Sequence, residues 1–174
     1  IFHNKQRLSD ILEAHARHIR GEHGAPRADL SGAKLDGANL RNVNLTGASL
    51  RGAQLEEADL RGAMLTRGDL SGCNLRKAQL MSCDLTEVNA EGADLTGANA
   101  SGAEMFRINL AGAKLIGATI RGSNLRAANL LGADLRKADL TNALVSESNL
   151  SEAMTEGADL STSVVRDMKK VAGN

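Results

Sequence analysis

A repeat of five residues governs most of this sequence. Every fifth residue from Leu30 to Leu160 gives 27 positions, and Leu fills 21 of them. The position two residues earlier, from Ala28 to Ser163, occurs 28 times and is Ala in 19 cases. This frame never slips, and it matches neither the helical period of about 3.6 residues nor the strand period of about 2. The pentad is therefore the structural unit of the chain.

Each pentad reads as a short extended piece followed by a corner. Side chains two residues apart in an extended segment point the same way, so the Ala and Leu positions face one side and the Asp or Asn between them faces the other. The remaining two positions are often Ser, Thr or Arg followed by Gly, which favour a turn. Burying one Leu stabilises by about 1.5–3 kcal/mol, whereas ordering each backbone residue costs about 1–2 kcal/mol. Pentads are therefore expected to fold only when stacked into a solenoid.

The pattern A-[D/N]-L-x-G from Ala28 to Ser163 resembles the pentapeptide-repeat family. The resemblance implies an all-β solenoid, the right-handed quadrilateral β-helix. In that fold four pentads make one square coil, the Leu and Ala side chains point inward, and the other three positions face water. It implies nearly seven coils here, spanning residues 28–163.

Residues 1–27 are predicted to form an N-terminal capping helix and a linker. The helix is expected from Lys5 to Arg20, because apolar residues recur there at helical spacing and Gly21 and Gly24 follow. We expect this face to cover the first coil. It comprises Leu8, Ile11, Leu12, His15 and Ile19.

Residues 164–174 are predicted to form a short C-terminal helix or tail. Its apolar residues again follow helical spacing; they are Val164, Val165, Met168 and Val171. Two interpretations stay open. The side chains either cover the last coil of a monomer, or they join two copies into a homodimer through the C-terminal end, as the family resemblance suggests.

No set of residues in the sequence predicts a catalytic, metal or cofactor site. His15 and His18 have a spacing that suits a shared metal, but no further ligand accompanies them. Cys73 and Cys83 occupy the small inward position on opposite walls of a coil, too far apart for a disulfide. A solid core of Leu and Ala leaves no internal pocket. We therefore expect a protein that is not an enzyme and uses no cofactor or metal.

Apolar residues interrupt the polar outward positions in one region of the repeat. They lie just after the central residue, where Ser, Thr, Arg or acidic residues are usual: Phe106, Ala111, Ile116 and Leu131. The pattern predicts either a protein interface or scattered surface residues. A stacked column of Asn89, Asn109, Asn129 and Asn149 is also expected, and hydrogen bonding within the fold explains it.

The charge balance restricts the classes of partner. Lys and Arg together number 21 and Asp and Glu also 21, so a strongly basic nucleic-acid binder is not expected. No apolar run approaches the length needed for membrane insertion, and the two cysteines suit a reducing compartment such as the cytoplasm.

The favoured function is a non-catalytic scaffold that binds protein partners. The alternative is a DNA-mimicking modulator of DNA gyrase or another topoisomerase. The family resemblance implies this activity, because some pentapeptide-repeat proteins have it. Such proteins tend to be acidic dimers with Phe at central positions. This chain is neutral and has no Phe at a central position, which disfavours the alternative.

Overall fold

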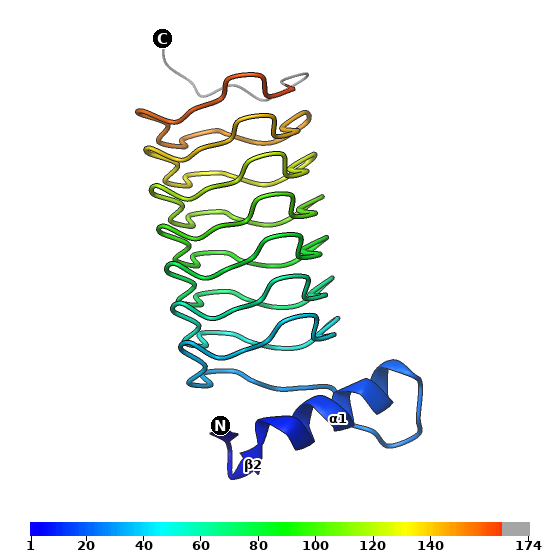
Figure 1. The fold of residues 1–174 in the computed structure, drawn as a ribbon. Coiled ribbons are helices and arrows are strands. Elements are labelled where there is room, and N and C mark those ends of the chain that lie inside the picture. The colour runs from blue at the N-terminus through cyan, green and yellow to red at the C-terminus, as the bar shows by residue number, and fades with distance from the viewer. Residues whose placement is uncertain (165–174) are drawn as a thin grey trace.

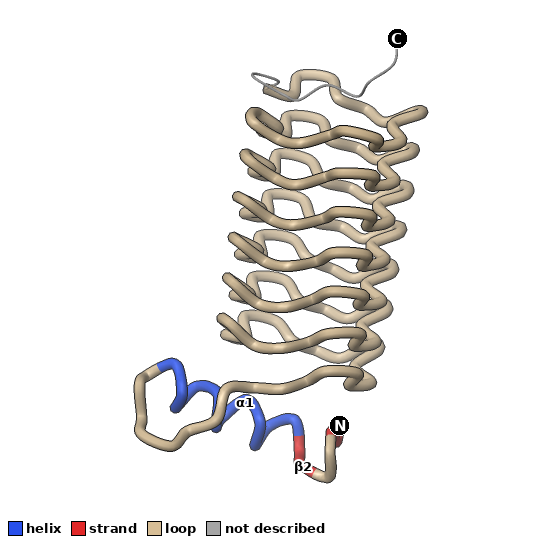
Figure 2. The backbone as a smooth tube through the Cα atoms, turned by 180° about the vertical axis from the view of Figure 1, so that it is seen from behind, coloured by secondary structure: helices blue, strands red, loops and turns tan. Residues whose placement is uncertain are grey.

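The protein is a rod with a small cap at its N-terminal end. A computed structural model describes residues 1–164. The elements are β1 (Phe2–His3), β2 (Gln6–Arg7) and α1 (Leu8–Ile19), and a stack of coils follows them (Figure 1). Seen from behind, the coils repeat with the same outline from one end of the rod to the other (Figure 2).

The N-terminal hairpin was not predicted from the sequence. β1 and β2 pair antiparallel, with Phe2 opposite Arg7. Asn4 and Lys5 between them both have positive φ, at 48° and 66°, which is the backbone of a type I′ hairpin turn. The prediction that a helix begins at Lys5 was therefore wrong. The turn lacks the Gly that usually marks it, and the chain enters the helix only at Leu8.

The coils are joined by parallel backbone pairing at a constant interval. Paired residues begin with Asp29 and Ser49 and continue in the same register to Leu144 and Val164. The N–H of Leu30 donates to the carbonyl of Ser49 at 2.7 Å, and the N–H of Ser49 donates back to Ala28 at 3.1 Å. The interval of 49 − 29 = 20 residues means four pentads per coil, so the predicted solenoid stacking is confirmed.

A tight turn closes every pentad. In the first one, the N–H of Ala33 donates to the carbonyl of Leu30 at 3.0 Å, and Gly32 between them has φ +66°. A bond between the first and fourth residues with positive φ at the third defines a type II turn. The same position has positive φ in every pentad from Gly32 to Thr162. This requirement explains the recurrent Gly of the repeat.

The Asp or Asn before the central residue completes the turn. In one pentad the Asp69 carboxylate accepts a hydrogen bond from the N–H of Ser71 at 3.0 Å. Every Asp or Asn at this position between Asp29 and Asp159 makes the equivalent bond. The ladder between coils leaves this N–H unpaired, so the side chain satisfies a donor that would otherwise depend on water.

Leu and Ala columns fill the interior of the rod. Where Ala90 and Ala100 replace Leu, the lost volume is made up nearby. Val88 and Ile108 are larger than the Ala that is usual at their inward positions, Met105 takes the place of a Leu of similar volume, and all three are almost fully buried. The core thus keeps the dense packing that protein interiors require.

Helix α1 covers the N-terminal end of the rod. The side chains of Ile11 and His15, both on α1, are buried against the rod. Leu8 and Leu12 of the same helix are partly buried, and they pack against the hydrophobic core. Ile19 does not follow the prediction, because it is 40% exposed. The end of α1 that carries Ile19 extends beyond the edge of the first coil (Figure 1).

The C-terminal prediction falls largely outside the described residues. Val164 is described and pairs with Leu144 in the ladder. Val165, Met168 and Val171 lie beyond residue 164, so the short C-terminal helix stays a prediction.

The turn geometry predicts opposite effects for two exchanges of Gly and Ala. Ala127 has φ +55°, whereas Gly112 has φ +62° with no atom within 4 Å of an added Cβ. A left-handed backbone costs an L-residue about 1–2 kcal/mol, and Gly has an entropic disadvantage of about 0.5–1 kcal/mol. Gly112→Ala should destabilise by about 1 kcal/mol, and Ala127→Gly should stabilise by up to about 1 kcal/mol, in chemical denaturation. Shifts of the same sign would contradict this account.

The compensated core layer predicts that Ala90→Leu overpacks. Because Val88 and Ile108 already occupy the space, the added volume should destabilise the fold by about 1–3 kcal/mol in denaturant titration. A variant as stable as the parent would show that the layer contains empty space.

Candidate protein-binding surfaces

The square coil presents four outer walls. Wall 1 contains residues 28–32 and the segments that follow them at intervals of 20 residues. In the same way, wall 2 begins with residues 33–37, wall 3 with 38–42 and wall 4 with 43–47. Because successive pentads lie on successive walls, residues ten apart in sequence lie on opposite sides of the rod.

Charged side chains on the walls are neutralised by close neighbours. On wall 3, Arg61 donates to both oxygens of Asp59 at 2.8 and 2.5 Å, with Arg41 3.9 Å away. These hydrogen bonds lower the pKa of Asp59 to about 2. On wall 2, Arg136 forms the same paired contact with Asp134 and also lowers the pKa of that carboxyl.

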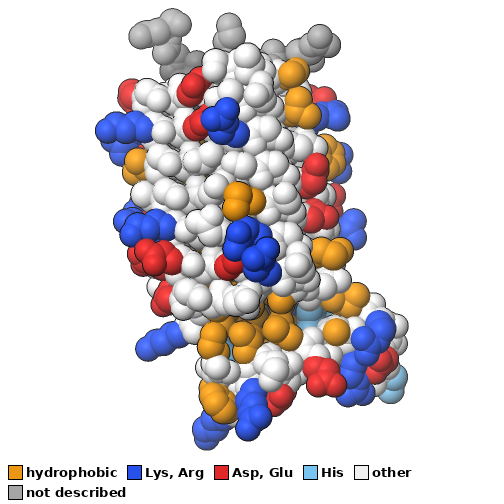
Figure 3. Space-filling view, in the orientation of Figure 1, with side chains coloured by type: hydrophobic (Ala, Val, Ile, Leu, Met, Phe, Trp, Pro, Cys, Tyr) orange, Lys and Arg blue, Asp and Glu red, His pale blue; other side chains and the backbone are white. Residues whose placement is uncertain are grey.

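A vertical ion-pair column on wall 4 follows the same principle. Glu87 lies 2.7 Å from Arg67 and 3.8 Å from Arg107 in neighbouring coils. Figure 3 shows basic and acidic side chains interspersed along one face of the rod. Exposed pairs of this kind contribute little stability, but they place charges of opposite sign side by side on the walls.

Wall 1 carries the predicted asparagine column. The side-chain amide of Asn109 donates to Asn89 at 3.0 Å, Asn129 donates to Asn109 at 3.0 Å, and Asn149 donates to Asn129 at 3.4 Å. The corner beside this column is formed by glycines, which have no side chain: Gly32, Gly52, Gly72, Gly92, Gly112 and Gly132. A shallow depression on this wall is lined by Arg51, Asp69, Ser71, Asn89, Glu91 and Gly92.

The structure separates the predicted apolar patch. Phe106 lies on wall 4, where Arg107 stacks 5.0 Å above its ring, and Ile116 lies on the opposite wall 2. Ala111 and Leu131 lie in one column of wall 1, where the N–H of Gly112 donates to the Leu131 carbonyl. Leu131 is 39% exposed. The four residues therefore do not form one surface, and only the Ala111–Leu131 pair is contiguous.

Sequence reasoning predicted Val164 as part of the C-terminal segment but missed three other exposed apolar residues, Met64, Leu144 and Met154. Leu144 and Val164 pair directly on wall 4 near the C-terminal end and are 37% and 42% exposed. Met64 on wall 4 and Met154 on wall 2 are exposed in the same kind of position. All four replace the usual Asp or Asn, and that substitution is the signal by which they could have been found.

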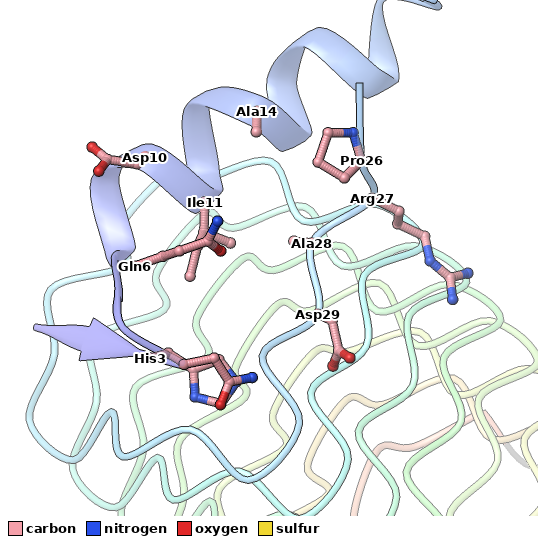
Figure 4. A pocket seen from close by; sticks show the side chains of 10 residues that line it. His3, Gln6, Asp10, Ile11, Ala14, Pro26, Arg27, Ala28 and Asp29 are labelled. Carbon is pink, nitrogen blue, oxygen red and sulfur yellow. The ribbon is translucent and has the colours of Figure 1, made fainter. Parts of the chain in front are cut away.

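The cap holds a small surface pocket of about 270 Å³ between the hairpin, α1 and the segment that enters the first coil. Figure 4 shows the side chains around it, which include His3, Gln6, Asp10, Ile11, Arg27 and Asp29. Asp29 already accepts a hydrogen bond from the Ser31 N–H. The lining mixes acidic, basic and apolar groups without a paired nucleophile and base.

His15 and His18, the two candidate metal ligands, each have one ring nitrogen within hydrogen-bonding distance of a backbone group. His15 and His18 stack with ring centroids 6.0 Å apart. His15 Nδ1 accepts from the N–H of Ala28, and His18 Nδ1 lies 2.9 Å from the Ala25 carbonyl. Within residues 1–164 no group of three potential metal ligands is found.

The two cysteines are buried on opposite walls. Each thiol donates to a backbone carbonyl, Cys73 to Leu50 and Cys83 to Leu60. Burial raises the pKa of both thiols to about 12, so neither is a ready nucleophile.

No helix within residues 1–164 is long and apolar enough to cross a membrane.

Comparison with known proteins agrees with this architecture. The family model described as pentapeptide repeats matches residues 27–62, 65–102 and 103–142, with eight copies. The chain belongs to the pentapeptide-repeat family. No curated protein sequence matches it significantly.

Solved structures of other family members are similar to this protein. HetL, a pentapeptide repeat protein involved in heterocyst differentiation regulation from the cyanobacterium Nostoc sp. strain PCC 7120, is 31% identical, with 79% of this chain and 72% of that chain covered and a TM-score of 0.47. Rfr23 from the cyanobacterium Cyanothece 51142 is 24% identical over 91% of this chain and 99% of that chain, with a TM-score of 0.51, and supports the solenoid fold. QnrB1, a plasmid-mediated fluoroquinolone resistance protein, is 19% identical over 78% and 85%, with a TM-score of 0.44.

The asparagine column predicts a structural cost for its removal. Asn109 makes two bonds to neighbouring asparagines and accepts a third from the Ala111 N–H. Asn109→Ala should therefore destabilise the fold by about 1–3 kcal/mol in denaturant titration. Thr119→Ala, at the same position of wall 3, is the matched control and should cost less. Equal stability of Asn109→Ala and the parent would show that the column contributes nothing to the fold.

Proposed function

We propose that this pentapeptide-repeat protein is a non-catalytic scaffold whose walls bind other proteins. The filled interior carries the proposal: the Leu and Ala columns are buried along the rod, and the coils pair their backbones with one another. Recognition is then left to the outer walls and the ends. From the family resemblance we also expect the coil to be right-handed.

The chemistry of the polar groups supports a non-catalytic role. Aspartates in the repeat accept hydrogen bonds from backbone N–H groups, and several are also paired with arginines. Such carboxylates are stabilised in their charged form, which makes them poor general acids near neutral pH.

The first partner we propose is a second copy of the chain, bound through the C-terminal end. Leu144 and Val164 form a contiguous exposed apolar pair on wall 4 at that end. Val165, Met168 and Val171 would extend the contact, in keeping with the apolar character of obligate interfaces. Ala111 and Leu131 on wall 1 are proposed as a second contact, for a different protein.

Leu144→Asp tests the homodimer without disturbing the fold. Asp is the residue type that the pentad prefers here, since its carboxylate can accept from the N–H of Ser146 as other aspartates do. The expected result is that light scattering shows half the mass of the parent, while the β signal in circular dichroism is kept.

Met64→Asp is the matched control for this test. Met64 occupies the same position of wall 4, far from the C-terminal end, and is similarly exposed. It should leave the mass unchanged. A parent that scatters as a monomer of about 18.2 kDa would refute the dimer.

The topoisomerase alternative predicts a different result. A DNA decoy needs a strong negative field, but several acidic groups of this rod are paired with arginines and the net charge is zero. We expect no inhibition of gyrase supercoiling at micromolar protein concentrations in a purified assay. Potent inhibition would favour the alternative over the scaffold.

A further inference from the structure

We propose that His15 makes the docking of α1 onto the rod pH-sensitive, so that mild acidification releases the helix and bares the N-terminal edge of the first coil. The inference is independent of which partner the walls bind. It rests on the position of one buried imidazole between two parts of the fold.

The geometry requires a neutral His15 ring in the docked state. The residue is 0% exposed, although its neighbours on α1 reach solvent. Its Nδ1 accepts a hydrogen bond from the N–H of Ala28 at 3.1 Å, so the ring proton lies on Nε2. Nε2 is also buried, and it has no hydrogen-bond partner within residues 1–164.

Protonation of the ring would remove this contact. An imidazolium carries a proton on both nitrogens, so its Nδ1 would point a donor at the N–H donor of Ala28. The positive charge would also be buried at the interface between α1 and the first coil. Both effects oppose docking and are absent once the helix separates and water reaches the ring.

The surrounding charges increase the effect. His18 on α1 and Arg27 on the segment that enters the first coil both oppose a positive charge on His15, and only the backbone of Thr46 in the first coil favours it. Burial is the largest cause, and together these groups lower the pKa of His15 below its ordinary value of 6.5. The released state binds the proton more readily. The contribution of His15 to docking is therefore fully present above pH 6.5 and is lost as the pH falls toward the docked-state pKa.

The surface beneath α1 is an open edge of parallel ladder. Elsewhere in the rod, the N–H before each central residue donates to the preceding coil, as Ser49 donates to Ala28. The first coil has no preceding coil, and the corresponding N–H groups find no acceptor in the described part of the chain; they belong to Asp29, Lys34, Asn39 and Asn44. An edge of this kind pairs readily with another extended segment, so α1 acts as a removable cover.

Hydrogen exchange of the full-length protein between about pH 7.5 and about pH 5 tests the proposal, since carboxylates stay largely ionised in that range. After correction for intrinsic exchange rates, protection of α1 should fall by up to about tenfold for each pH unit below 6.5 until the docked-state pKa is reached. Protection of the central coils should not change. Loss of protection in the whole rod, or none in α1, would overturn the proposal.

Two variants separate the histidines. His15→Gln keeps a carbonyl oxygen that can accept from Ala28 but does not titrate, so the protection of α1 should become independent of pH. His18→Gln should keep the pH response. A full pH response in His15→Gln would refute the assignment to His15.

An NMR titration of the four histidines keeps the idea testable if His15→Gln fails to dock. In the parent protein the His15 resonance should titrate below its ordinary value of 6.5, together with the loss of α1 protection. Titration of His15 at an ordinary pH while α1 stays protected would overturn the proposal.

Discussion

The rod depends on the hydrogen bond that closes each pentad, from the N–H of one inward residue to the carbonyl of the previous central residue. This bond requires positive φ at the corner residue. Gly adopts this backbone conformation readily, whereas any other residue there is strained. It also turns the chain onto the next wall after every five residues. The stacking of Leu columns and the ladders between coils both follow from that regular change of direction.

Much of this was predictable because the same physical requirement recurs in every pentad. One pentad could be misread, but a register that holds from Leu30 to Leu160 could not. The errors lie where the repeat ends or where one wall must be told from another. The Asn4–Lys5 turn is a single local event with no repeat to support it. Phe106 and Ile116 lie only ten residues apart in the sequence, yet the two corners between them place them on opposite walls.

The outward Asp and Asn residues illustrate how fold and function share one sequence position. A side chain such as Asp69 satisfies a backbone donor, so its frequency in the repeat reflects folding rather than recognition. Departures from that rule are therefore more informative than the rule. Leu144 gives up a hydrogen bond that its neighbours make and exposes an apolar surface instead. Such a substitution is expected to persist where another molecule covers it.

The interval of 20 residues between paired positions also determines how such a rod can change in length. Each coil contacts only its immediate neighbours, as in other solenoids. Duplicating one whole coil would lengthen the rod by about 4.8 Å and leave every wall in phase. Duplicating a single pentad would keep the core intact but rotate everything beyond it by a quarter turn. Evolution could thus move a binding residue to another wall without changing that residue at all.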